Sequence, residues 1–344
     1  MSDRTRGVVR STIALTISLL LCGFSNAQQT RNVFVPYSDN LKALADTGDT
    51  DGETALGVAY LQGNGTKRDV ALAASLFQAA YKQGDADAAA WLGSLYIAGQ
   101  GVPANVPKGL ALIKEAQDDG SSVGVRFAAS ALEKGIGQPA NVQKALDLYQ
   151  IAANQLDPVA RDRMAMAFEA GLYRTQDLDQ AAALYDQASA AGYSWAQLHL
   201  GELYASNLGF NDARENRAKG AEPWLREAYN MYVLSANGGN RVGAFRRGQA
   251  LAQGAGVGQD LQGAEAAFRQ AIQQRYGPAQ EALADMYAQN PELGHSKIDQ
   301  YILLKRAVSN GQESARAKLS ALEKSMPADQ VAFANAHVVA KPAR

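Results

Sequence analysis

Cysteine and histidine are nearly absent from this chain of 344 residues, which contains one cysteine and three histidines. Cys22 has no second cysteine with which to form an intramolecular disulfide. His199, His295 and His337 lie far apart and match no metal-binding spacing. The sequence also lacks a nucleophile elbow, a phosphate-binding loop after a strand and paired cysteines. We therefore expect no catalytic site, no metal and no cofactor, and predict that the protein is not an enzyme.

Charge is also scarce. Charged residues make up 19% of the chain, the formal net charge is −1, and no long block of like charge appears. A surface that binds nucleic acid normally carries a stripe of lysine and arginine. The composition therefore argues against nucleic acid as the main partner.

The chain has one markedly apolar stretch, and it lies at the N-terminus. Residues 1–27 combine three early arginines, an apolar segment at 12–22 that is too short to span a bilayer, and small residues before Ala27. This layout predicts a secretory signal that is cleaved after Ala27, and a periplasmic or secreted protein. The alternative is an outer-membrane lipoprotein anchored at Cys22, although Leu21 departs from the small residue expected there. Membrane contact is expected only in that case.

What the chain does have is a repeat of 36 residues. Gly48, Gly84, Gly120 and Gly192 fall on one grid, with Leu156 in the remaining slot, and after an 11-residue insertion the grid resumes at Gly239, Arg275 and Gly311. A fixed period of this length is typical of stacked structural units, which form an extended surface. The predicted organisation is residues 28–47 as an N-terminal segment with a capping helix, a solenoid over 48–323, and a C-terminal cap and tail at 324–344. The predicted units are 48–83, 84–119, 120–155, 156–191, 192–238, 239–274 and 275–310, followed by a partial unit at 311–323.

The residue pattern of each unit predicts two helices joined by a loop, which in most units contains glycine. Asp85 is a helix cap, while Gly99 and Gly101 break the first helix. Nine residues after each grid position the side chain is small, as at Gly93, and three residues later it is usually large, as at Tyr96. The second helices carry an analogous small column and large column. Alternating columns of this kind are what interdigitated helix packing requires.

The motif A-x-x-x-L-G-x-x-Y-x-x-G-x-G in Ala88–Gly101, with a similar run at Ala196–Gly209, resembles the Sel-one-like repeat (SLR) family. The second-helix run Lys144–Ala153 fits the same family. The resemblance covers about residues 48–323. It implies an all-α protein, a right-handed α/α superhelical solenoid of about seven SLR helix hairpins related to tetratricopeptide arrays. Terminal capping helices are expected at Ser38–Ala45 and at 326–338.

By analogy with tetratricopeptide arrays, we expect first-helix positions six, ten and thirteen after each grid residue to be exposed on the concave face. The resulting partner-binding candidates are Val58, Leu61, Ile97, Arg126, Glu133, Asp162, Met166, Glu169, Glu202 and Phe245. An apolar end followed by an acidic middle would suit a peptide or helix with an apolar anchor and basic groups. The alternative is that these side chains are simply solvated.

The polar insertion within residues 206–224 is a second candidate surface. Trp195 and Trp224 belong to the same unit and are further partner-binding candidates. Insertions in solenoids often decorate one face and contact partners. The alternative is a tolerated surface loop.

Exported members of the SLR family act as docking surfaces in exopolysaccharide production and in the regulation of sensor kinases. The resemblance therefore implies a non-catalytic scaffold or adaptor of the bacterial cell envelope that binds another envelope protein or peptide segment. Exopolysaccharide export or its regulation is the implied process. Two alternatives stay open: an enzyme acting on the cell wall or on β-lactams, and a secreted factor acting on other cells.

Overall fold

The computed structural model describes residues 35–172, 175–206 and 222–339. These residues form seventeen α-helices and one short 3₁₀ helix, with no strand among them. The predicted signal segment and Cys22 lie outside the described residues, as does most of the polar insertion. The all-α architecture predicted from the repeat is confirmed.

Fourteen of the helices form seven antiparallel hairpins. The hairpins are α3 (Thr50–Gln62) with α4 (Val70–Lys82), α5 (Ala86–Ala98) with α6 (Val106–Asp118), α7 (Ser122–Lys134) with α8 (Val142–Asn154), α9 (Pro158–Glu169) with α10 (Leu178–Ala190), α11 (Ser194–Ser206) with α13 (Glu222–Asn237), α14 (Arg241–Gln253) with α15 (Leu261–Gln273), and α16 (Gly277–Gln289) with α17 (Lys297–Ser309). The remaining elements are α2 (Asp39–Asp46), η2 (Pro291–Leu293), α18 (Ala315–Lys324) and α19 (Ala328–Val339).

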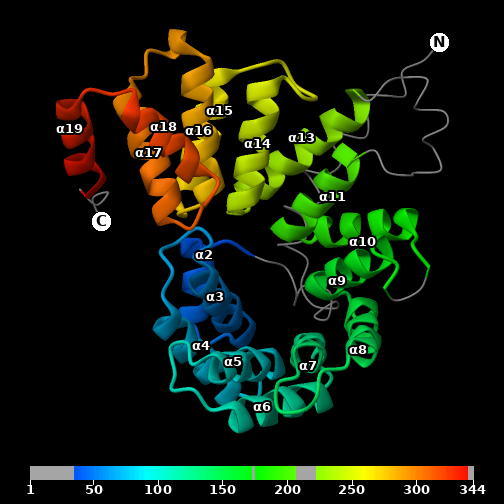
Figure 1. The fold of residues 1–344 in the computed structure, drawn as a ribbon. Coiled ribbons are helices and arrows are strands. Elements are labelled where there is room, and N and C mark those ends of the chain that lie inside the picture. Colours follow the sequence, from blue (N-terminus) through cyan, green and yellow to red (C-terminus); the bar gives the residue numbers. More distant parts are fainter. Residues whose placement is uncertain (1–34, 173–174, 207–221, 340–344) are drawn as a thin grey trace, which may run out of the picture.

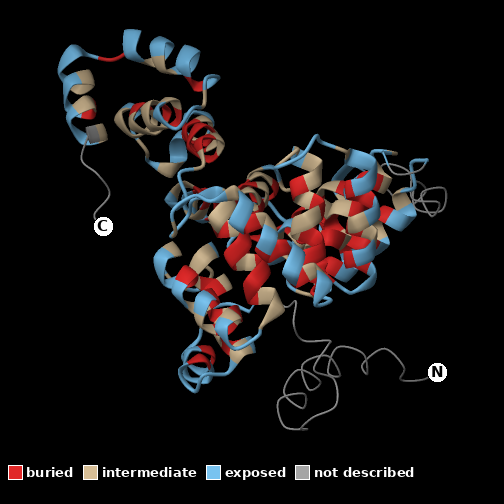
Figure 2. Ribbon diagram, turned by 90° about the horizontal axis from the view of Figure 1, so that it is seen from below, coloured by how far each residue is buried: buried red, intermediate tan, exposed pale blue. Residues whose placement is uncertain are grey.

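The hairpins follow one another along a curved path, from α3 through α9 to α17 (Figure 1). In the perpendicular view, the helices next to the C-terminus stand away from the rest of the molecule, so the path is a superhelix and not a flat ring (Figure 2). Buried residues lie between successive helices along the whole path. The hydrophobic core is therefore a continuous strip between hairpins, as expected for a solenoid.

The grid residue lies at the corner where one hairpin ends and the next begins. Every corner has a positive φ, including 90° at Gly84, 71° at Leu156 and 57° at Arg275. Glycine adopts this left-handed conformation without steric cost, whereas a side chain crowds its own backbone there. The 36-residue glycine period is thus a requirement of the corner geometry, and Leu156 and Arg275 adopt it under strain.

The two helices of a hairpin approach each other closely at the small columns. A Cβ atom added to Gly93 would lie 2.7 Å from the carbonyl oxygen of Gly109 on the facing helix, and one added to Gly109 would lie 2.6 Å from the carbonyl oxygen of Gly93. At Gly201 the added atom would lie 2.7 Å from the ring of Tyr232. The predicted pairing of small and large columns is confirmed.

The ends of the solenoid are covered by additional helices. Ser38 caps the start of α2, its hydroxyl accepting a hydrogen bond from the Leu41 amide. At the other end α18 and α19 both pack against α17, and the Tyr301 hydroxyl donates to Asn335 at 3.2 Å. The segment expected to begin an eighth unit is therefore one half of a two-helix cap.

Gly93→Leu should lower the free energy of unfolding by about 1–3 kcal/mol or more, because a side chain at this contact would push α5 away from α6. Chemical denaturation followed by circular dichroism measures the change. Ala98→Leu, at the exposed end of the same helix, is the matched control and should have little effect. Equal stability of the Gly93→Leu variant and the unsubstituted protein would contradict the close approach.

Leu156→Gly should raise the free energy of unfolding by about 0.5–1 kcal/mol, because glycine adopts the left-handed corner without strain. Part of this gain is offset because glycine also raises the conformational entropy of the unfolded chain. Gly84→Ala places a side chain at the equivalent corner, where the added Cβ meets no atom within 4 Å. It should therefore lower stability by about 1 kcal/mol through backbone strain alone. Two shifts of the same sign in thermal melts would contradict this account of the corners.

Candidate functional site

A cavity of about 940 Å³ lies on the inner side of the curved array. Its lining comes from hairpins far apart in the sequence, so the cavity is formed by the curvature of the solenoid. We call it the channel. Its described lining residues are Leu61, Gln62, Gly63, Asn64, Thr66, Arg68, Trp91, Arg126, Val159, Gly192, Tyr193, Ser194, Trp195, Gly238, Gly239, Asn240, Arg241, Gln273 and Gln274.

The described lining of the channel contains no aspartate and no glutamate. It combines arginines, aromatic rings and side-chain amides, and most of these residues lie in loops or near helix ends. The arginines are Arg68, Arg126 and Arg241, the aromatic residues are Trp91, Tyr193 and Trp195, and the amides are Gln62, Asn64, Asn240, Gln273 and Gln274. The channel therefore offers positive charge and ring faces, together with groups that both donate and accept hydrogen bonds.

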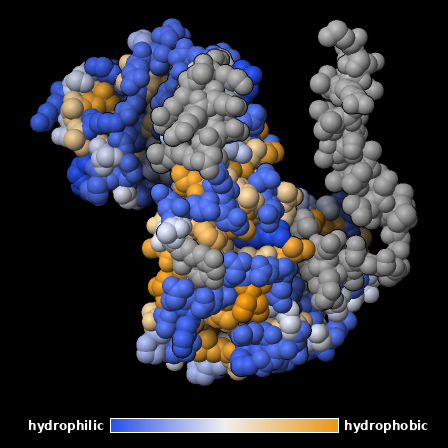
Figure 3. All heavy atoms as spheres, turned by 90° about the vertical axis from the view of Figure 1, so that its right-hand side faces the viewer, coloured by the Kyte–Doolittle hydropathy of each residue, from blue (hydrophilic) through white to orange (hydrophobic). Residues whose placement is uncertain are grey.

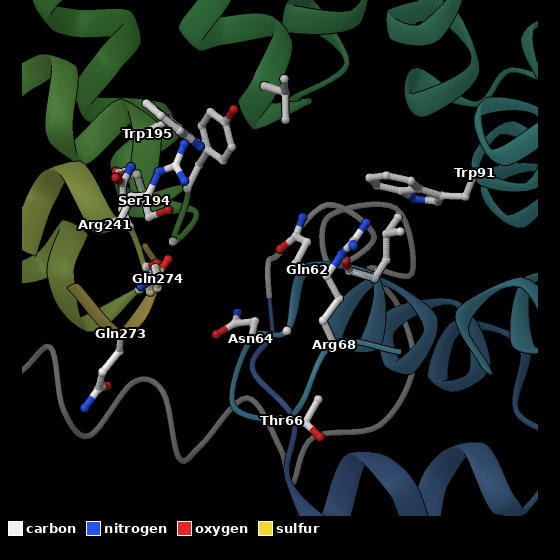
Figure 4. Close-up of a pocket in the computed structure, with 18 of the residues that line it drawn as sticks. Gln62, Asn64, Thr66, Arg68, Trp91, Ser194, Trp195, Arg241, Gln273 and Gln274 are labelled. Atoms are coloured by element: carbon white, nitrogen blue, oxygen red, sulfur yellow. Dashed lines mark hydrogen bonds between the residues drawn. The ribbon is translucent and has the colours of Figure 1, made fainter. Parts of the chain in front are cut away.

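Each of two facing walls of the channel carries an aromatic and a cationic side chain. Figure 4 shows Trp195 and Arg241 on one wall, with Trp91 and Arg68 on the other. Trp195 is 43% exposed, an unusual degree for tryptophan. Neither Arg68 nor Arg241 forms an ion pair with a described residue. Both charges are therefore available to a ligand.

Arg126 and Trp91 are held in a packed aromatic assembly. The Trp91 ring stacks on Phe77 with a centroid separation of 5.8 Å and meets the edge of Phe127 at 5.0 Å. The Arg126 guanidinium lies 4.4 Å from the Phe127 ring centre, and its Nε donates to Asp157 at 3.0 Å. Side chains ordered before binding lose less conformational entropy when a ligand arrives.

The structure corrects the expected exposure of position six. Arg126, Asp162 and Phe245 are 7%, 3% and 9% exposed, and each faces the next hairpin of the array. Asp162 contacts His199 at 2.7 Å, and the Phe245 ring lies 5.4 Å from the Tyr276 ring. Arg126 reaches the channel wall as well, but Asp162 and Phe245 are not among its lining residues.

The acidic candidates also have partners within the solenoid. Glu133 accepts a hydrogen bond from the Tyr149 hydroxyl at 3.0 Å, and Glu169 accepts one from Tyr185 at 2.7 Å. Burial, together with the charge of Glu133, raises the pKa of Tyr149 to about 12, so its hydroxyl remains a donor at neutral pH. The glutamates of the predicted acidic middle therefore form hydrogen bonds within the array, and neither of them is among the lining residues of the channel.

Glu202 is likewise engaged, forming an ion pair of 2.8 Å with Arg246 of the next hairpin. Among the tryptophans, Trp224 packs against Tyr204 of its own hairpin at 5.4 Å, whereas Trp195 lines the channel. The sequence between them, residues 207–221, lies outside the described residues.

The apolar candidates divide between packing and the channel. Leu61 lines the channel, while Val58 and Ile97 are half-buried within the array. Met166 is 37% exposed but does not line the channel. Figure 3 shows one face of the molecule, where hydrophobic areas are scattered among hydrophilic residues.

The sequence reasoning missed most of the channel. Trp91 lies seven positions after its grid glycine, next to position six. Tyr193 and Asn240 immediately follow corners, Arg241 comes one residue later, and Gln274 immediately precedes a corner. The signal that could have identified these residues is a cluster of aromatic and polar side chains at successive corners.

His199 links α9 to α11 beside the channel. Its ring lies 6.1 Å from Trp195, and its Nδ1 lies 2.7 Å from Asp162. Burial alone lowers the pKa of His199, but the hydrogen bond and charge of Asp162, with smaller contributions from Glu202 and Glu169, raise it above 6.5. Protonation therefore strengthens the link between these two hairpins.

No group of three or more histidine, cysteine, aspartate or glutamate residues in the described part of the chain is arranged to hold a metal ion. Within the same part of the chain, no helix combines the length and apolarity that crossing a bilayer requires.

The sequence profile of the Sel1 repeat matches residues 50–85, 86–121, 125–155 and 158–193. These four segments coincide with the first four hairpins, within a few residues at each end. Residues 50–193 belong to the Sel1 repeat family. Sel1 repeats are helical scaffolds that mediate protein–protein interaction and are in general non-catalytic.

Among solved structures, a Sel1 repeat protein from Oxalobacter formigenes has 25% sequence identity and a TM-score of 0.56, and the match covers 82% of this chain and 79% of that one. A protective antigen of uropathogenic Escherichia coli with an SLR fold has 24% identity and a TM-score of 0.43, covering 86% and 69%. The immunity protein Pa5087 from Pseudomonas aeruginosa has 19% identity and a TM-score of 0.46, covering 73% and 88%. No curated protein matches the sequence.

The helical-hairpin architecture continues past the matched segments. The hairpins α11–α13, α14–α15 and α16–α17 lie beyond residue 193 and keep the same corner geometry at Gly239, Arg275 and Gly311. Trp91 and Arg126 come from matched repeats, whereas Trp195 and Arg241 come from the later ones. The channel is therefore a property of the whole array of hairpins.

Because the pKa of His199 is raised in the folded protein, the stability contributed by its proton is complete below pH 6.5 and is lost as the pH rises through the raised value. His199→Gln should therefore destabilise the protein more at about pH 6 than at about pH 9. Urea denaturation of both proteins at both pH values measures this difference. The control is His337→Gln, at an exposed histidine on α19. An equal loss for His199→Gln at both pH values would contradict the Asp162 link.

Proposed function

We propose that this protein is a non-catalytic scaffold of the bacterial cell envelope that holds a partner protein in its channel. The observation that carries the proposal is the lining of the channel, where arginine, aromatic and amide side chains from several hairpins face one space. Tryptophan, tyrosine and arginine are the residues that dominate binding energy at protein interfaces.

The size and construction of the channel support this function. Its volume of about 940 Å³ lies within the range of clefts that enclose a ligand, roughly 300–1,000 Å³. Arg126 and Trp91 are fixed by packing before any ligand arrives, while Trp195 presents an exposed ring. A fixed wall facing an exposed aromatic anchor suits a segment of a partner that enters the channel.

The cellular setting is the second part of the proposal. The basic start, the apolar segment and the small residues before Ala27 support export across the inner membrane, with lipidation at Cys22 as the alternative. The resemblance to exported SLR proteins supports a role in exopolysaccharide export or in its regulation. Cell fractionation would test the setting, and recovery of the mature chain in the cytosol would contradict it.

A photo-crosslinking residue should show whether a partner binds in the channel or on the outer surface. With p-benzoylphenylalanine at position 195, irradiation of cells should produce a discrete adduct with a partner protein, because this ring is exposed inside the channel. The matched control is the same residue at position 151, where the exposed Ile151 side chain on α8 does not line the channel.

Immunoblotting followed by mass spectrometry of the adducts measures the outcome. The scaffold proposal predicts an adduct from position 195 that is absent from position 151. Adducts of equal yield from both positions, or from position 151 alone, would place the interaction outside the channel.

A further inference from the structure

We infer that the segment held in the channel is an extended acidic stretch of polypeptide. This inference rests on the proposed function and specifies the chemistry of the partner. It starts from the charge of the described lining, which contains three arginines and no carboxylate side chain.

The three arginines do not contribute equally. Arg126 is buried and forms an ion pair with Asp157. The pair therefore contributes little net charge to the channel, and Arg126 serves mainly in packing against aromatic rings. Arg68 donates through Nε to the Leu61 carbonyl oxygen at 2.9 Å, and Arg241 lies 5.6 Å from the Tyr276 ring. Neither of these two has an acidic partner within the described structure, and they face the channel from opposite walls (Figure 4). Carboxylates lying between them would be contacted from both sides, with the bidentate geometry that guanidinium favours.

The backbone adds to the positive potential of the same space. The helices α11 and α14 begin at the channel wall, where Ser194 and Arg241 belong to its lining. The helix α9 also begins there, but the carboxylate of Asp157 caps its first turn and offsets its positive end. The N-terminus of a helix carries a partial positive charge from its aligned peptide dipoles. The termini of α11 and α14 reinforce the two arginines and disfavour a basic segment.

The uncharged part of the lining suits a peptide main chain. Side-chain amides such as Gln62, Asn64 and Gln273 both donate and accept, as do the N–H and C=O groups of an extended segment. Trp91 and Trp195 supply apolar faces between them. An acidic segment with interspersed apolar residues would pair with the arginines, form hydrogen bonds with the amides and pack against the tryptophan rings. A basic segment would find no carboxylate in the described lining.

The inference is tested by fluorescence anisotropy with a short labelled oligoglutamate as the probe and oligolysine as its opposite. The folded protein should bind oligoglutamate, with an affinity that falls as salt is added, and should not bind oligolysine. The double variant Arg68→Gln and Arg241→Gln should weaken binding by about tenfold or more, because each arginine donates charge-assisted hydrogen bonds. Arg316→Gln removes an exposed arginine on α18, outside the channel, and should leave binding unchanged.

Three outcomes would overturn the inference. The first is no binding of oligoglutamate by the folded protein. The second is equal binding by the double variant and by Arg316→Gln, with matching melting curves. The third is binding of an acidic glycan, probed with oligogalacturonate, in preference to oligoglutamate. If oligoglutamate does not bind while position 195 still crosslinks to a protein, the inference of an acidic segment is wrong and the proposed scaffold function is retained. If neither binding nor crosslinking is observed, the proposed function is contradicted as well.

Discussion

The close approach of the two helices within each hairpin is the constraint on which the rest of this structure depends. At Gly93 and Gly109 the helices come so near that even a methyl group would meet the opposite backbone. Gly201 and Gly248 admit the rings of Tyr232 and Phe268 in the same manner. Because each hairpin is packed this tightly, it behaves as a rigid unit, and the superhelix is the result of stacking such units at left-handed corners.

Successive hairpins are then joined by polar links. Asp162 contacts His199, Glu202 pairs with Arg246, and in the last full repeat Glu281 pairs with Lys318 at 2.7 Å. The first two links join the first helices of successive hairpins, and the third joins α16 to the capping helix α18. These carboxylates are paired within the array, and the described lining of the channel carries arginine, amide and aromatic groups.

Much of the fold could be predicted because the corner and the helix contact each demand a small residue at a fixed place. Gly84 and Gly93 follow directly from those demands, and so does the hairpin between them. The channel could not be predicted in the same way. Positions six and seven after the grid residue differ by about 100° around the helix, and periodicity alone does not tell which of them lines the inner space. Asp162 and Phe245 at position six face the next hairpin, whereas Trp91 at position seven lines the channel. The meeting of Arg68 with Arg241 depends on the curvature of the array, which accumulates from small rotations between repeats.

The central claim is that seven helical hairpins curve around an open channel and do not collapse onto a common core. Small-angle X-ray scattering from residues 35–339 tests this most directly. A compact protein of about this length has a radius of gyration of roughly 20 Å. The account predicts a clearly larger value and a distance distribution skewed toward long vectors, as a curved solenoid gives. A radius near that of a compact globule, with a symmetric distance distribution, would contradict it.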